Sequence, residues 1–149
     1  MKHDRVTIYN KFSGCCAYCG EAINIKDMQV DHVIPASSFQ YYVRNKTKVP
    51  QFLIHLTVDD VNHPDNLFPT CRVCNNWKRA EPLETFRGEL QAQVPRLNEY
   101  SAQYRIARRY GRVYENNDAP IVFYFETYRS IQEYIKIGEK VNGRETKDV

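Results

Sequence analysis

The spacing of hydrophobic residues in the front half of the chain predicts strands and short helices. Residues 28–34 alternate between apolar and polar side chains, which predicts a strand that a proline ends. Residues 66–70 form a second extended segment, and residues 71–78 contain neither Gly nor Pro and predict a helix. Residues 4–13 predict a short helix or an extended lead-in, and residues 36–64 predict irregular or helical pieces.

The back half carries apolar residues at helical spacing. They recur every three or four positions from Leu83 to Leu97, which is the period of one buried helix face, and Pro95 is expected to divide the helix. A further helix is predicted from Ser101, whose side chain can cap its start. Gly111 suits a left-handed residue at its end.

The last apolar segments complete the predicted architecture. Residues 121–125 favour a strand, and residues 127–137 predict a terminal helix. The pattern therefore predicts an α+β fold. In it, residues 1–81 form a small core and residues 82–149 form a mainly helical extension, packed on that core as a single structural unit.

Composition narrows the class of protein without choosing a function. The chain has 149 residues, of which 42% are hydrophobic and 26% are charged, so it suits one compact domain. It has no apolar stretch long enough for a membrane span and no signal-peptide core, so we expect a cytoplasmic protein with no membrane partner. The net charge of +3 is too small to indicate a nucleic-acid partner by itself.

The cysteines are more informative than the charge. Cys16 and Cys19 form one C-x-x-C pair, Cys71 and Cys74 form another, and 51 residues lie between the pairs. Two such pairs can supply the four thiolates that a structural zinc ion prefers. The alternative is two unrelated buried pairs or a redox pair. Cys15 could replace Cys16, but C-x-x-C is the commoner register, so we interpret Cys15 as a small buried neighbour.

A second set of residues predicts metal-dependent hydrolysis. Breaking a phosphodiester needs a base for the attacking water and a cation that stabilises negative charge. His32 suits the base, and Asp31 and Asn75 offer the hard oxygens that magnesium or manganese prefers. Neighbouring strand residues point to opposite faces, so Asp31 and His32 cannot both face one cation on a regular strand.

The order of these motifs carries a resemblance to a known family. The chain contains, in order, C-x-x-C, V-D-H-V-I-P, D-N-L and C-x-x-C-N-x-x-K, and in this it resembles the HNH endonucleases, whose site is a ββα-metal motif. The resemblance implies that His32 is the general base and that Asp31 and Asn75 bind the catalytic cation. It also implies that Asn66 positions the segment bearing the base and that Lys78 contacts phosphate.

The resemblance covers residues 16–78, and two departures stand within it. Asn75 occupies the position where the family name has a histidine, which leaves the metal preference open. The 33 residues between His32 and Asn66 suggest an inserted loop. The helical tail resembles only loosely the extensions of some bacterial and phage members.

Other residues offer weaker signals. A row of arginines at helical spacing predicts a phosphate-binding face, with an ordinary solvated helix face as the alternative. The row comprises Arg105, Arg108, Arg109 and Arg112. Trp77 is expected to pack in the core. His3, His55 and His63 lack metal-type spacing, and we expect ordinary surface or loop roles for them.

Together these signals predict a DNA endonuclease that carries a structural zinc and a catalytic magnesium or manganese, and that acts on double-stranded DNA. The alternative is a zinc-stabilised nucleic-acid-binding module without catalysis, and a third reading is a toxin nuclease that needs an immunity partner. One site cuts one strand at a time. Cutting of both strands would therefore imply a homodimer or two successive events.

Overall fold

The computed structural model describes residues 4–128 of the chain. These residues form helices and one small antiparallel sheet of two strands, which confirms the predicted α+β class. No helix in this part of the chain combines the length and the apolar character that a membrane crossing requires.

The described residues fall into two compact units, each built from separated segments. The first unit contains residues 4–31, 67–75 and 122–128, and the second contains residues 32–66 and 76–121. Two of the four boundaries between the units fall inside an element, one in a strand after Asp31 and one in a helix after Asn75. The division at residue 81 expected from the sequence stays a prediction.

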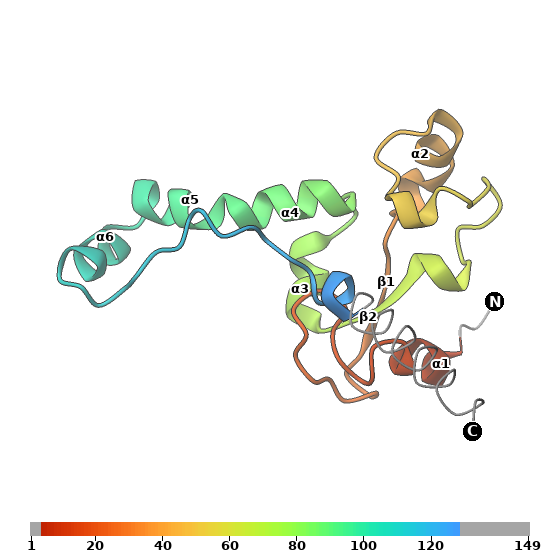
Figure 1. Ribbon diagram of the computed structural model, residues 1–149, viewed down its shortest axis with the longest axis horizontal. Helices are drawn as coiled ribbons and strands as arrows, with labels where there is room; N and C mark the ends of the chain where they lie inside the picture. The colour runs from red at the N-terminus through yellow and green to blue at the C-terminus, as the bar shows by residue number, and fades with distance from the viewer. Residues whose placement is uncertain (1–3, 129–149) are drawn as a thin grey trace, which may run out of the picture. The chain divides into compact units, whose positions relative to one another are not determined.

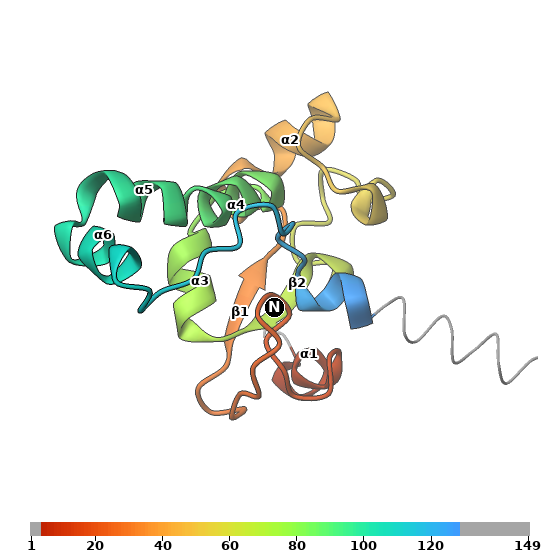
Figure 2. The same cartoon turned by 60° about the vertical axis from the view of Figure 1, so that its left-hand side comes forward.

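The first unit holds the sheet. Its elements are helix α1, most of strand β1, strand β2 and the start of helix α3, with bounds Arg5–Asn10, Gln29–His32, Leu67–Thr70 and Arg72–Lys78. Asp4 caps α1 by accepting a hydrogen bond from the Val6 N–H at 3.1 Å. Helix α1 packs against β2 (Figure 1), and the two strands lie side by side (Figure 2). The predicted strands and the helix after Cys71 are confirmed.

Aromatic rings form much of the core of the first unit. The ring centroids of Phe68 and Phe125 lie 4.9 Å apart, and those of Tyr18 and Phe123 lie 5.2 Å apart. All four side chains are buried. Edge-to-face and tilted ring pairs of this kind add to the free energy of burial. Through Phe123 and Phe125, residues 122–128 are therefore part of this core, although they lie far from Tyr18 and Phe68 in sequence.

The predicted strand at residues 121–125 is wrong. Residues 121–123 are irregular and a helix begins at Tyr124. Glu126 accepts a hydrogen bond from the Phe123 N–H at 2.9 Å, which is one half of a capping box and explains this start. Residues 127 and 128 continue the helix, and the remainder of the terminal helix expected at 127–137 lies outside the described residues.

The second unit consists of short helices joined by loops. Residues 36–64 contain short helical pieces joined by turns and irregular segments, as expected. Its helices are η1 (Ala36–Ser38), α2 (Phe39–Asn45), η2 (Gln51–Leu53), η3 (Pro64–Asn66), α4 (Leu83–Gln91), α5 (Gln93–Tyr100) and α6 (Ala102–Arg109).

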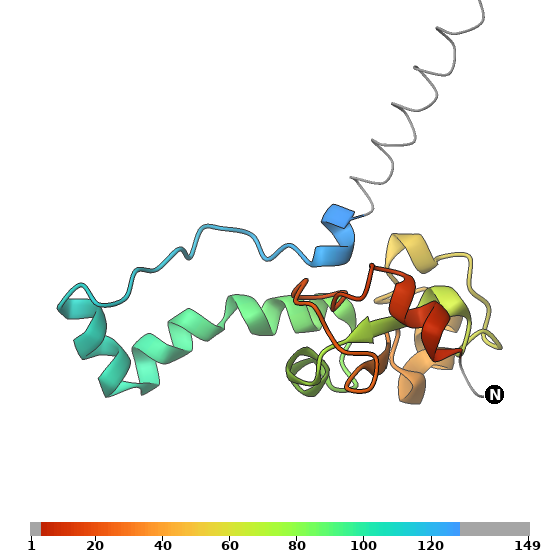
Figure 3. The same cartoon turned by 90° about the horizontal axis from the view of Figure 1, so that it is seen from below.

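Helices α4, α5 and α6 follow the predicted boundaries. Helix α4 ends at Gln91 and α5 begins at Gln93, so Pro95 lies in the first turn of α5, where a missing N–H is tolerated. Ser101 caps α6 by accepting from the Tyr104 N–H at 3.1 Å, and Gly111 has a φ of +66°. Figure 3 shows α4 and α5 nearly end to end, with the returning chain alongside them.

Candidate functional site

The four predicted cysteines form one cluster in the first unit. The sulfurs of Cys16, Cys19, Cys71 and Cys74 all lie within 4.8 Å of one another, and those of Cys19 and Cys71 are 3.9 Å apart. A tetrahedral zinc with bonds of about 2.3 Å would separate its sulfur ligands by about 3.8 Å. The cluster could therefore hold a metal ion, and its geometry is compatible with structural zinc.

Local backbone geometry brings these sulfurs together. Gly20 donates its N–H to the Cys16 carbonyl at 2.9 Å and has a φ of +78°, which closes the first turn. A Cβ on Gly20 would lie 2.8 Å from the Tyr124 ring, so no larger residue fits there. In the second turn, the Cys74 N–H donates to the Cys71 sulfur at 3.3 Å.

Cys15 lies outside the cluster, as the C-x-x-C spacing predicts. Its thiol is 3.9 Å from the Ser13 carbonyl and it is partly exposed. The prediction that Cys15 is a small buried neighbour is wrong, because the residue is only partly buried. Its sulfur is not among the four that lie together.

The thiols of the cluster differ in their affinity for protons. A hydrogen bond from Cys74 lowers the pKa of Cys16 to about 4, and burial raises the pKa of Cys19 to about 11. The hydrogen bond to Cys16 in turn raises the pKa of Cys74 well above its ordinary value. The raised pKa values favour protons on Cys19 and Cys74.

Zinc affinity of the cluster is expected to fall as the pH falls. Binding must displace protons from the thiols, those of Cys19 and Cys74 among them, so the apparent affinity weakens by at least about 100-fold per pH unit below the raised pKa values. Competition with a chromophoric chelator at pH 6.5 and 7.5 measures the change. Equal affinities at both pH values would contradict this prediction.

Asp31 is buried in the first unit and is held by Tyr18. The Tyr18 hydroxyl donates to Asp31 Oδ2 at 2.6 Å. Burial and the charge of Asp31 raise the pKa of Tyr18, so the phenol keeps its proton for this bond. Sequence reasoning missed Tyr18, whose only signal is its place between Cys16 and Cys19.

Asn75 lies on α3, is half-buried and donates its N–H to the Cys71 carbonyl at 3.0 Å.

The imidazole of His32 belongs to the second unit and is partly exposed. Its Nε2 lies 3.0 Å from Asn62 Oδ1. An amide oxygen only accepts hydrogen bonds, so this contact suits the tautomer with the proton on Nε2 and the lone pair on Nδ1. Asn62 was not predicted, because nothing in its sequence position connects it to His32.

Asn66 fixes the chain immediately after His32. It is fully buried, and its Oδ1 accepts from the Ile34 N–H at 2.8 Å. Its Nδ2 donates to the carbonyls of Ile34 and Val61 at 3.2 and 2.9 Å. A buried amide satisfied on both sides stiffens the segments that it joins.

Lys78 does not lie where the sequence predicts. Its side chain is fully buried, and Nζ donates to the main-chain carbonyl of His32 at 3.0 Å. The expected phosphate contact is therefore wrong, because the ammonium is turned inward. Trp77 was also misplaced, since it is 52% exposed. Successive helix residues point about 100° apart, so an inward Lys78 turns Trp77 outward.

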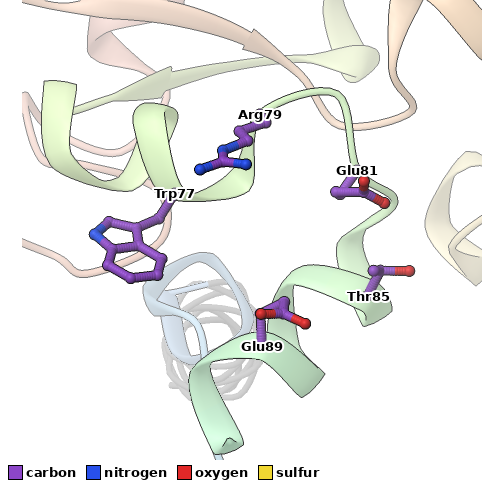
Figure 4. A pocket seen from close by; sticks show the side chains of 5 residues that line it. All are labelled: Trp77, Arg79, Glu81, Thr85 and Glu89. Carbon is purple, nitrogen blue, oxygen red and sulfur yellow. The ribbon is translucent and has the colours of Figure 1, made fainter. Parts of the chain in front are cut away.

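A hollow of about 310 Å³ lies beside Trp77 in the second unit. Figure 4 shows the Trp77 ring at its edge, with Arg79 on the same side and Glu89 across from them. Thr85 and Glu81 complete the lining. Because acidic and basic groups share this hollow, it is not a uniformly basic surface.

The predicted arginine row is partly used within the protein. Arg105 donates to the carbonyls of Asn98 and Glu99 at 3.0 and 2.8 Å, where α5 ends. Arg108 donates to Asn98 Oδ1 at 2.9 Å, and its Nε lies 3.4 Å from a Glu115 oxygen. These contacts give both residues a structural role that the helical spacing did not predict.

The row still presents positive charge to solvent. Arg109 and Arg112 are exposed, and Arg105, Arg108 and Arg109 line a shallow hollow of about 530 Å³ together with Asn98.

No match was found when the sequence was compared with models of known families and with curated proteins, or when the fold was compared with solved structures. A functional assignment therefore depends on the residues of this chain.

Proposed function

We propose that this chain is a metal-dependent DNA endonuclease of the HNH type, in which His32 activates the attacking water. The observation that supports this best is the way His32 is held. Its carbonyl accepts from Lys78, its ring is oriented by Asn62, and the imidazole is still partly exposed. A fixed main chain with an accessible, oriented ring is what a general base needs.

His32 would take the proton of water at Nδ1. The hydrogen bond from Nε2 to Asn62 selects this tautomer and stabilises the imidazolium that forms. Asn66 keeps the next residues in register through Ile34, so the base does not drift from its substrate. In this proposal Asn62, Asn66 and Lys78 are positioning residues, and His32 is the catalytic one.

Asp31 and Asn75 are the proposed ligands of a catalytic magnesium or manganese ion. Their carboxylate and amide oxygens are donors that such hard cations prefer. The bond from Tyr18 orients the Asp31 carboxylate at Oδ2. When bound, the cation would stabilise negative charge on the phosphate and on the leaving oxygen.

The four-cysteine cluster is proposed to carry structural zinc. With all four positions filled by thiolates, such an ion would stabilise the first unit without entering the reaction. The exposed Arg109 and Arg112, together with the hollow lined by Arg105 and Arg108, are the proposed contacts to the phosphates of double-stranded DNA.

Plasmid cleavage tests the proposal. Purified protein with supercoiled DNA is expected to produce nicked circles with magnesium or manganese and none without added cation, because charge stabilisation on the phosphate is lost. Zinc content is measured in every sample, so that loss of the structural ion is not mistaken for loss of the catalytic one. Linear product that appears together with the first nicks would indicate a homodimer.

Two results would contradict the nuclease. Cleavage that is unchanged in the absence of any added divalent cation would refute the metal-dependent mechanism. DNA binding without cleavage, in protein that retains zinc, would favour a nucleic-acid-binding module instead.

A further inference from the structure

A second group of metal-binding side chains lies in the second unit, away from the cysteines. His55, His63 and Asp65 place one ligand atom each within 4.8 Å of the others. His55 Nε2 is 3.0 Å from Asp65 Oδ2, and His63 Nδ1 is 3.8 Å from the same oxygen. The side chains are 38–50% exposed, so an ion from solvent can reach them.

A hydrogen-bonded turn brings the two histidines together. Asp60 Oδ2 accepts from the N–H and from the hydroxyl of Thr57, both at 2.7 Å. The Asp60 N–H donates back to the Thr57 carbonyl at 3.0 Å, and the His63 N–H donates to the Asp60 carbonyl at 2.9 Å. The chain therefore reverses between the histidines before any ion is bound, which lowers the entropy cost of assembling the ligands.

The distances are close to those that a metal ion requires. Ligand bonds of about 2.0–2.2 Å separate neighbouring ligand atoms by roughly 3–3.5 Å. The distance between His55 Nε2 and Asp65 Oδ2 is already in this range at 3.0 Å. His63 Nδ1 is 3.8 Å from the same oxygen and would have to move by less than about 1 Å for that distance to enter the range. Half-exposed side chains can make such a shift by small rotations about their χ angles.

The protonation state of His63 is also suitable. Its Nδ1 accepts a hydrogen bond from the Asp65 N–H at 3.2 Å, so this nitrogen carries a lone pair. A metal ion would use the same lone pair and would replace this long hydrogen bond. His55 Nε2 now donates to the Asp65 carboxylate, so its use as a ligand requires that its proton moves to Nδ1 or leaves to solvent when the ion binds.

We propose that His55, His63 and Asp65 form a second metal site that binds a divalent transition ion, with zinc as the favoured ion. Two imidazoles and one carboxylate prefer zinc and related ions to magnesium or calcium. Its three ligands belong neither to the cysteine cluster nor to the residues proposed for the nuclease activity.

Metal binding here would brace the loop that supports His32. Residues 55–65 include Asn62, the partner of the His32 ring, and Asn66 follows directly. An ion joining residues 55, 63 and 65 closes this loop at its two ends, and a closed loop loses fewer conformations on ordering. The second ion therefore has a structural effect that reaches the segment holding His32.

Zinc titration of the full chain tests the site. The wild type is expected to bind a second equivalent of zinc after the cysteine cluster is filled. His55→Ala and His63→Ala are each expected to weaken binding of this equivalent by 10-fold or more and to leave the first one intact. Asp59→Asn is the matched control, because Asp59 is a nearby exposed carboxylate outside the group, and it should bind zinc as the wild type does.

A second readout needs no variant. The ring nitrogen signals of His55 and His63 in NMR spectra of the wild type should shift when the second equivalent is added. Absence of a second equivalent at free zinc up to about 100 µM would overturn the proposal. So would a second equivalent that persists in both histidine variants, or one that leaves the ring signals of His55 and His63 unchanged.

Discussion

His32→Ala is expected to lower the rate of metal-dependent plasmid cleavage by about 10²–10⁴-fold, the usual contribution of a general base. Alanine removes the only group at this position that can take a proton from water. The main chain of residue 32 should still be held by Lys78, because that bond goes to a carbonyl that alanine keeps. Single-turnover cleavage of supercoiled DNA, with zinc content measured in parallel, checks the prediction.

Two further variants make this test specific. Asn62→Ala removes the partner of His32 Nε2 but not the base, so a smaller loss than in His32→Ala is expected. Gln40→Ala alters an exposed position of α2 and should cleave as the wild type does. If His32→Ala, folded and holding zinc, cleaves at the rate of Gln40→Ala, His32 is not the base.

Cys74→Ser is expected to weaken zinc binding and to destabilise the first unit. Zinc binding to four thiolates is worth about 10–16 kcal/mol, so loss of one ligand of four should cost roughly 2–4 kcal/mol. This is a large share of the stability of a small domain. Zinc content and hydrogen exchange of residues 4–31 and 67–75 measure the effect, and protection of these amides should fall.

The fifth cysteine provides the control for this variant. Cys15→Ser also changes a thiol to a hydroxyl in the first unit, directly before Cys16, but its sulfur lies outside the cluster, so zinc content and amide protection should stay near those of the wild type. If Cys74→Ser and Cys15→Ser hold zinc equally well, the cluster is not a four-thiolate site.

Much of the fold followed from local signals in the sequence. Pro95 and Ser101 set helix boundaries through their own backbone and side-chain chemistry, so their effect does not depend on distant residues. The cysteine pairs were found for a similar reason. A gap of two residues lets one turn direct both sulfurs to one ion. Only the proximity of the two turns depends on the tertiary fold.

The failures concern side chains whose partners are distant in sequence. Lys78 is polar and basic, so its type suggested solvent or DNA, whereas its actual partner is a carbonyl 46 residues earlier. The segment 121–125 has β-favouring composition, but the rings of Phe123 and Phe125 pack with Tyr18 and Phe68. Tertiary packing overrides local preference in such cases.

The candidate site shows the same limit. His32 and Asn66 could be selected from motif order, while Asn62 could not, since its role depends on a loop that returns to His32. His55 and His63 are eight positions apart, which is not one of the short ligand spacings typical of zinc motifs. Their proximity depends on the turn that Thr57 and Asp60 close.

The segmented construction of the first unit has a consequence for its synthesis on the ribosome. All four cluster cysteines are translated well before Phe123 and Phe125, whose rings complete the packing around Tyr18. At about 5–20 residues per second, the roughly 50 residues between Cys74 and the pair Phe123 and Phe125 take about 2.5–10 s to appear. Metal capture by the nascent chain can thus precede closure of the aromatic core, and the ion would organise the unit while its last segment is still being made.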